Sequence, residues 1–149
     1  MKKMLSVLLA IMMIATLALT GCGQNNDPTP DPAPATRTFT DSLGREVTLP
    51  ANLSKIAISG PLAQIVVFAI APDMMVGIAN GWADEAKGLI PDEYYNLPLL
   101  GQLYGGKGEL NLETLLQSGA EVVIDVGEQK DGMADDLNAL QEQTGIPFV

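Results

Sequence analysis

TFTDSLGREVTLPANLSKIAISGP, at residues 38–61, is the stretch that decides the fold. In its first half, the apolar residues Phe39, Val47 and Leu49 lie on both sides of a polar turn at residues 41–45. Apolar and polar residues alternate along each arm, and this alternation around a turn predicts a β-hairpin.

The second half of the stretch predicts a strand that leads directly into a helix. Residues 55–59 are a short apolar strand, and the apolar run 62–71 predicts the helix. Pro61 suits the first helical position, and we expect Ser59 to cap the free amides of the helix. The turn at Gly60 would leave backbone N–H groups directed at open space. Ligands of open α/β sheets bind at this edge, so we expect a binding lobe.

The remainder of the chain continues the alternation of strands and helices. Alternating elements of this length predict an α/β fold, with a Rossmann-like parallel sheet, helices on both of its faces and the β-hairpin before it. The last predicted strand runs to the final residue without a polar tail, so we expect a truncated chain. The predicted strands lie at 75–79, 97–101, 121–126 and 146–149, and the main predicted helices lie at 111–118 and 132–144.

The first 22 residues predict an exported lipoprotein. Lys2 and Lys3 precede a mostly apolar run at residues 5–19, which is too short to span a bilayer and typical of a signal peptide. The run ends in LTGC at residues 19–22, which matches a lipobox. We therefore expect a lipoprotein signal peptide at 1–21 and lipidation of Cys22. The alternative is an ordinary signal peptide, or an anchor helix, with a chance cysteine.

Residues 23–36, GQNNDPTPDPAPAT, contain four prolines and no large apolar side chain. Such a segment cannot bury a core, and proline-rich chain stays extended. At roughly 3 Å per residue it reaches on the order of 40 Å. We therefore expect residues 22–37 to be a lipidated tether and residues 38–149 to be the folded domain.

The composition excludes several classes of function. The chain has 18 acidic and 8 basic residues, for a net charge of −10, and removal of the signal peptide with Lys2 and Lys3 would make it −12. An acidic domain repels phosphate backbones, so no nucleic-acid partner is expected. With no histidine and a single cysteine, the chain lacks the commonest metal ligand and general base. We expect neither an enzyme, nor a direct metal site, nor a cofactor.

Six segments together resemble one family. They read TFTDSLGREVTLP, KIAISGP, VGIANGW, LPLLGQLYGGKGELNLETLL, EVVIDVGE and QEQTGIPFV, in this order. The chain resembles, over residues 37–149, the N-terminal lobe of the substrate-binding lipoproteins of ABC importers for iron–siderophore complexes, haem and cobalamin. The resemblance implies two α/β lobes joined by a long helix, with the ligand between them. This chain would supply the first lobe, and the second lobe would be absent.

The resemblance also implies which residues line the ligand cleft. They belong to the turn after the first strand, the loop after the second strand and the segment before the NLE motif. The alternative for the turn is a plain helix start, and for the tryptophan a surface ring packed on its own helix. The implied ligand-binding residues are Ser59, Gly60, Pro61, Leu62, Trp82, Tyr104 and Gly105.

In this family an acidic residue on each lobe docks onto arginines of the permease. Glu113, in the NLE motif, is the matching position. Its neighbours Leu112 and Leu115 take the buried side of the predicted helix, so we expect Glu113 to face solvent. Without the resemblance, it would be an ordinary solvated charge.

A rival motif at residues 101–108, GQLYGGKG, partly fits a phosphate-binding loop. Gly108 stands where Ser or Thr should hold magnesium, and the next helix begins only at Asn111. An exported protein also meets no ATP pool. We interpret these glycines as a loop that turns at the rim of the cleft.

These expectations combine into one function and its alternatives. We expect a substrate-binding protein anchored to the extracytoplasmic face of the cell membrane. It would capture a metal chelate, a ferric siderophore in the first place, and deliver it to an ABC permease. The alternatives are a cobalamin or haem receptor of the same family, a surface lipoprotein with an α/β interaction domain and no transported ligand, and a lipoprotein enzyme whose chemistry lies in the missing half.

Overall fold

The computed structural model of the chain describes residues 35–104 and 109–149. The predicted signal peptide at 1–21, Cys22 and Gly105 lie outside these residues, and so does most of the predicted tether. The described residues fall within one compact unit, Pro34–Val149.

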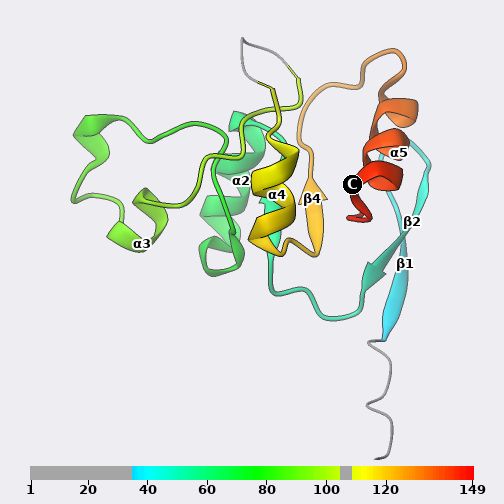
Figure 1. Cartoon of the computed structure of the whole chain (residues 1–149), viewed down its shortest axis with the longest axis horizontal. Helices are drawn as coiled ribbons and strands as arrows, with labels where there is room; N and C mark the ends of the chain where they lie inside the picture. Colours follow the sequence, from blue (N-terminus) through cyan, green and yellow to red (C-terminus); the bar gives the residue numbers. More distant parts are fainter. Residues whose placement is uncertain (1–34, 105–108) are drawn as a thin grey trace, which may run out of the picture. The chain divides into compact units, whose positions relative to one another are not determined.

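The centre of the structure is a parallel pair of short strands (Figure 1). β3 (Ile56–Ile58) pairs with β4 (Val122–Ile124), with Ala57 opposite Val123. All six residues of the two strands are apolar, and five of them are buried, as is typical of parallel strands covered on both faces.

Three further segments extend this pair into a wider parallel sheet. The predicted strands at 75–79, 97–101 and 146–149 each join through an isolated bridge rather than a continuous ladder. Across the sheet, the order is therefore the segment 97–101, the segment 75–79, β3, β4 and the segment 146–149. This is the strand order of a doubly wound fold. The bridges pair Ile56 with Met75, Ile78 with Leu99, and Val123 with Phe148, all in parallel.

One face of the sheet is covered by α2 (Pro61–Ile70). Ile56 and Ile58 alternate along β3 and direct their side chains to this face, where they join Ala63 and Val67 of the helix in one buried cluster. The predicted helix at 62–71 is thus confirmed, with Pro61 at its start.

The opposite face is covered by α4 (Leu112–Ser118) and α5 (Met133–Thr144). Val123 of β4 joins Leu115 of α4 and Leu137 of α5 in a second buried cluster. Both helices end at glycines in the left-handed conformation, Gly119 and Gly145. Helices therefore lie on both faces of the parallel sheet, which confirms the predicted fold class.

The predicted hairpin is also confirmed. β1 (Thr36–Thr40) and β2 (Glu46–Pro50) pair antiparallel, with Phe39 opposite Val47. Val47 and Leu49 are buried, whereas Phe39 is 42% exposed. Only β2 therefore contributes to the core, and β1 is an outer strand that begins at residue 36 rather than 38.

Arg45 links the hairpin to the rest of the domain through hydrogen bonds. Arg45 Nη2 donates to the carbonyl oxygen of Phe148 at 2.7 Å, and Nη1 donates to Asn138 Oδ1 of α5 at 2.9 Å. The same guanidinium forms an ion pair with Asp41 at 2.7 Å. Figure 1 shows the resulting arrangement, with β1 and β2 beside α5 and the end of the chain.

Shorter elements complete the described chain: the 3-10 helices η1 (Pro72–Met74) and η2 (Asp84–Ala86), and the one-turn helix α3 (Asp92–Tyr95). Within the described ranges, no helix is both long enough and apolar enough to cross a bilayer.

The Asp41–Arg45 pair predicts a pH dependence of stability. Burial raises the pKa of the Asp41 carboxyl, but hydrogen bonds and positive charge from Arg45 outweigh it and hold the pKa below its usual value. A carboxyl with a depressed folded pKa stabilises the fold above its unfolded pKa of about 4, and this contribution is lost as the pH falls through the folded pKa. In urea titrations, Asp41→Asn should therefore be destabilising at pH 7, by an amount that shrinks below pH ~4.

Asp84→Asn is the matched control, because Asp84 is exposed in η2. It should change the free energy of unfolding little at either pH. A loss in Asp41→Asn of the same size at neutral and acidic pH would contradict the proposed role of the ion pair.

Candidate functional site

The carboxyl ends of β3 and β4 form the point where the chain connections diverge. After β3 the chain enters α2 on one face of the sheet, and after β4 it continues to α5 on the other. The two connections leave a crevice between them, and open α/β sheets bind their ligands at such a crevice.

A hydrogen bond links the first residues beyond these two strands. Ser59 follows β3 and is only 2% exposed, and its Oγ donates to Oδ1 of Asp125, which follows β4. The Ser59 amide also donates to the Ile124 carbonyl at 3.1 Å, so Ser59 still belongs to the sheet.

The prediction that Ser59 caps α2 is therefore wrong. Gly60 occupies the N-cap position, and no side chain caps the helix there. The Ser59 hydroxyl instead donates to the carboxylate of Asp125. A hydrogen bond to an ionised acceptor is stronger than a hydrogen bond between neutral groups, such as a serine cap would form.

A cavity of about 120 Å³ opens directly above this hydrogen bond. Its walls come from the turn between β3 and α2, from Tyr104 and from the loop after β4. Five of the seven predicted ligand residues line it, namely Ser59, Gly60, Pro61, Leu62 and Tyr104. The loop after β4 contributes Asp125, Val126, Gly127, Glu128 and Lys130.

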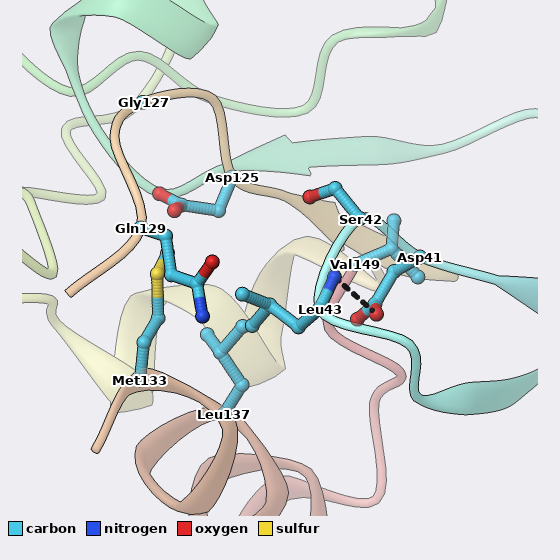
Figure 2. Close-up of a pocket in the computed structure, with 9 residues that line it drawn as sticks. All are labelled: Asp41, Ser42, Leu43, Asp125, Gly127, Gln129, Met133, Leu137 and Val149. Atoms are coloured by element: carbon cyan, nitrogen blue, oxygen red, sulfur yellow. Dashed lines mark hydrogen bonds between the residues drawn. The ribbon is translucent and has the colours of Figure 1, made fainter. Parts of the chain in front are cut away.

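A second cavity of about 50 Å³ lies beside Asp125, toward the hairpin. Figure 2 shows Asp125 and Gly127 on one side of it, the turn at residues 41–43 on another, and Met133 and Leu137 of α5 below. This volume holds a few water molecules and not an organic ligand. The larger of these two cavities is the candidate site, because it lies at the carboxyl ends of β3 and β4 and five predicted ligand residues line it. Asp125 belongs to the walls of both.

Tyr104 is held at the rim of the larger cavity by two charged side chains. Its hydroxyl donates to Asp136 Oδ2 at 3.2 Å, and Lys130 Nζ lies 4.1 Å from the centroid of its ring. Burial and the negative charge of Asp136 raise the pKa of Tyr104 to about 12. The phenol is therefore protonated at neutral pH, as an ordinary tyrosine is.

Trp82 does not line this cavity. Its Nε1 donates to the Tyr94 carbonyl at 3.0 Å, and its ring lies 5.0 Å from that of Phe68 on α2. The loop before it is fixed by the buried Gln64, whose Oε1 accepts from the Ala79 amide at 2.8 Å. Ser59 and Tyr104 thus share a cavity to which Trp82 does not contribute, and a ligand contact at Trp82 stays a prediction.

Glu113 is exposed in the first turn of α4, as expected from its buried neighbours. Its Oε1 accepts from Gln117 Nε2 at 3.2 Å, one helical turn away. The carboxylate therefore faces solvent, and its docking role stays a prediction.

The chain is similar to known proteins in structure but not detectably in sequence. No family profile and no curated protein sequence matches the chain. Solved structures do match. An ABC transporter solute-binding protein from Sulfurospirillum deleyianum superposes with a TM-score of 0.63 at 20% identity, over 76% of this chain and 35% of its own.

Two further matches were solved with their ligands. The molybdate periplasmic binding protein of Haemophilus influenzae, bound to molybdate, has a TM-score of 0.55 at 24% identity, over 76% of this chain and 33% of its own. CeuE of Helicobacter pylori, in a Ni-His complex, has a TM-score of 0.52 at 23% identity, over 77% of this chain and 36% of its own. This chain has the fold of one lobe of a solute-binding protein.

The chain spans about a third of the length of the proteins it matches. This agrees with the expectation of a single lobe. Within its described residues, no group of three or more His, Cys, Asp or Glu side chains is arranged to hold a metal ion.

Sequence reasoning did not assign the loop after β4 to the site of this lobe. The signal was present, because Asp125 interrupts the apolar residues 122–126 and directly follows the strand. Only the pairing of β4 with β3 places this carboxylate beside Ser59.

The Ser59–Asp125 hydrogen bond predicts the effect of one substitution. Ser59→Ala should lower the free energy of unfolding by about 1–2 kcal/mol, because it removes a hydrogen bond to a charged acceptor. Urea denaturation measures this loss. Ser42→Ala, at an exposed position of the hairpin turn, is the control and should have little effect. Equal stability of the two variants would show that the Ser59 hydroxyl does not hold the strand ends together.

Proposed function

We propose that this protein is the membrane-anchored, substrate-binding component of an ABC importer. It captures a metal chelate, a ferric siderophore in the first place, at the extracytoplasmic face and delivers it to the permease. Cobalamin and haem are the alternative ligands of the same class.

The observation that carries this proposal is the cavity at the carboxyl ends of β3 and β4, in a lobe with the fold of solute-binding proteins. Enclosed sites for drug-sized ligands have volumes of roughly 300–1,000 Å³. A cavity of about 120 Å³ is too small to be such a site by itself, so its lining residues would form only one side of the site. The threefold greater length of the matching proteins supports a second wall supplied from elsewhere.

A chelate rather than a bare ion suits the side chains of this lobe. The sequence contains no histidine, and the described residues hold no metal-ligating cluster. Naked transition metals prefer imidazole or thiolate ligands. The turn at Gly60, the apolar Leu62 and the ring of Tyr104 suit the organic shell of a complexed metal instead.

Delivery would depend on two features outside the cavity. Lipid on Cys22 would keep the protein at the membrane surface, within reach of the permease. The solvent-facing carboxylate of Glu113 would pair with permease arginines, an electrostatic contact that weakens as salt increases.

Binding by the full-length protein tests the proposal. A ferric hydroxamate siderophore, cobalamin and haem are titrated separately in a calorimeter, and we expect saturable binding of one of them. Tyr104→Ala should weaken this binding about tenfold, the loss that corresponds to ~1.4 kcal/mol of ring contact. Tyr95→Ala in α3, which does not line the cavity, should bind as the wild type does. Failure of all three probes to bind would contradict the proposal.

Delivery has a separate test. Glu113→Lys should reduce uptake of the radiolabelled chelate by cells and leave the affinity of the purified protein unchanged, because the residue lies outside the cavity. Glu142→Lys, the same charge reversal at an exposed position of α5, should leave uptake intact. Joint loss of affinity and uptake in Glu113→Lys would refute the docking assignment.

A further inference from the structure

The charged groups on the walls of the larger cavity carry an inference about its ligand, which rests on the function proposed above. Among the described residues, two carboxylates and one ammonium line the cavity: Asp125, Glu128 and Lys130. The side chains that line the cavity therefore carry more negative than positive charge.

Two cations near the cavity in the described part of the chain, Lys130 and Arg45, are already in contact with groups of the fold. Lys130 Nζ lies over the ring of Tyr104, 4.1 Å from its centroid, and the hydroxyl of that ring donates to a further carboxylate, Asp136. Arg45 is paired with Asp41 at 2.7 Å and donates to two other groups of the fold. The guanidinium of Arg45 is therefore not free to bind an incoming anion through both of its terminal nitrogens.

Asp125 keeps capacity to accept hydrogen bonds from a ligand. The structure gives its carboxylate one side-chain donor, Ser59 Oγ on Oδ1. An ionised carboxylate offers about four lone-pair sites, so several remain. Because Asp125 lines the cavity, these sites are available to a donor that enters it.

The amino end of α2 contributes positive charge to the cavity, but this charge is smaller than that of the carboxylates. A helix end carries roughly half a positive charge. Pro61 stands in the first position, so one of the amides that would serve an anion is absent. The half charge and the ammonium of Lys130 together do not offset the two carboxylates, so the described residues that line the cavity carry a net negative charge.

We infer that this lobe selects a neutral or cationic chelate, with hydrogen-bond donors of the ligand directed at Asp125. Anionic chelates and oxyanions are disfavoured. The site would therefore differ in charge preference from the molybdate-binding protein that shares its fold, since molybdate is an anion.

Paired probes of opposite charge test this selectivity on the full-length protein. The probes are a ferric trihydroxamate that carries a free ammonium group, a ferric tricatecholate of charge −3, and molybdate. Calorimetry should show the trihydroxamate binding at least about tenfold more tightly than either anion, because each unit charge a few ångströms away contributes a kcal/mol or more near a protein surface. The preference should shrink as salt is raised.

Two variants assign the selectivity to the cavity. Asp125→Asn should reduce the affinity ratio of trihydroxamate to tricatecholate about tenfold, and Glu128→Gln should reduce it in the same direction. Glu128 is exposed, so this second variant does not depend on tolerance of the Ser59 contact. Asp131→Asn removes an equal charge from an exposed position outside the cavity and should leave the ratio unchanged.

The outcomes separate this inference from the proposed function. Tighter binding of tricatecholate or molybdate by the wild type, or a ratio unaltered in both cavity variants, would overturn the charge selectivity while leaving a chelate receptor in place. Absence of binding by a chelate of any charge would overturn the proposed function and this inference with it.

Discussion

The parallel pairing of β3 with β4 is the constraint on which the remainder of the lobe depends. The pairing sets Ala57 opposite Val123, and both are fully buried. Successive residues of a strand face opposite sides of the sheet, so this register assigns each side chain to one of the two cores. It also brings the residues after the two strands to the same height, and there Ser59 meets Asp125. The core and the candidate site thus follow from a single register.

The elements with strong periodicity were predictable from the sequence. The apolar run of α2, the buried strand EVVIDV and the amphipathic α5 between two glycines lie close to their predicted positions. Ser59 was predicted as a helix cap because local sequence favours that role. A residue 66 positions away in the chain decides otherwise, and no local pattern records that partner. Tertiary contacts of this kind set the limit of sequence reasoning here.

The residues of the candidate site were likewise predictable only in part. The resemblance to the importer family indicated the turn Ser59-Gly60-Pro61 and Tyr104, and the structure brings these residues to one cavity. Trp82 carried a similar signal but packs against Phe68 and donates to Tyr94. Asp125 and its loop were missed, since their importance comes from the strand order and not from their composition.

The contact of Arg45 with the Phe148 carbonyl has a consequence for how the domain matures. It joins residues 103 positions apart, and the hairpin itself is a local structure that forms early. Closing so long a loop costs entropy that is recovered only once both ends are in place. During synthesis, this contact can therefore form only long after the hairpin itself has been made. Until then the hairpin lacks its hydrogen bonds to the Phe148 carbonyl and to Asn138 of α5.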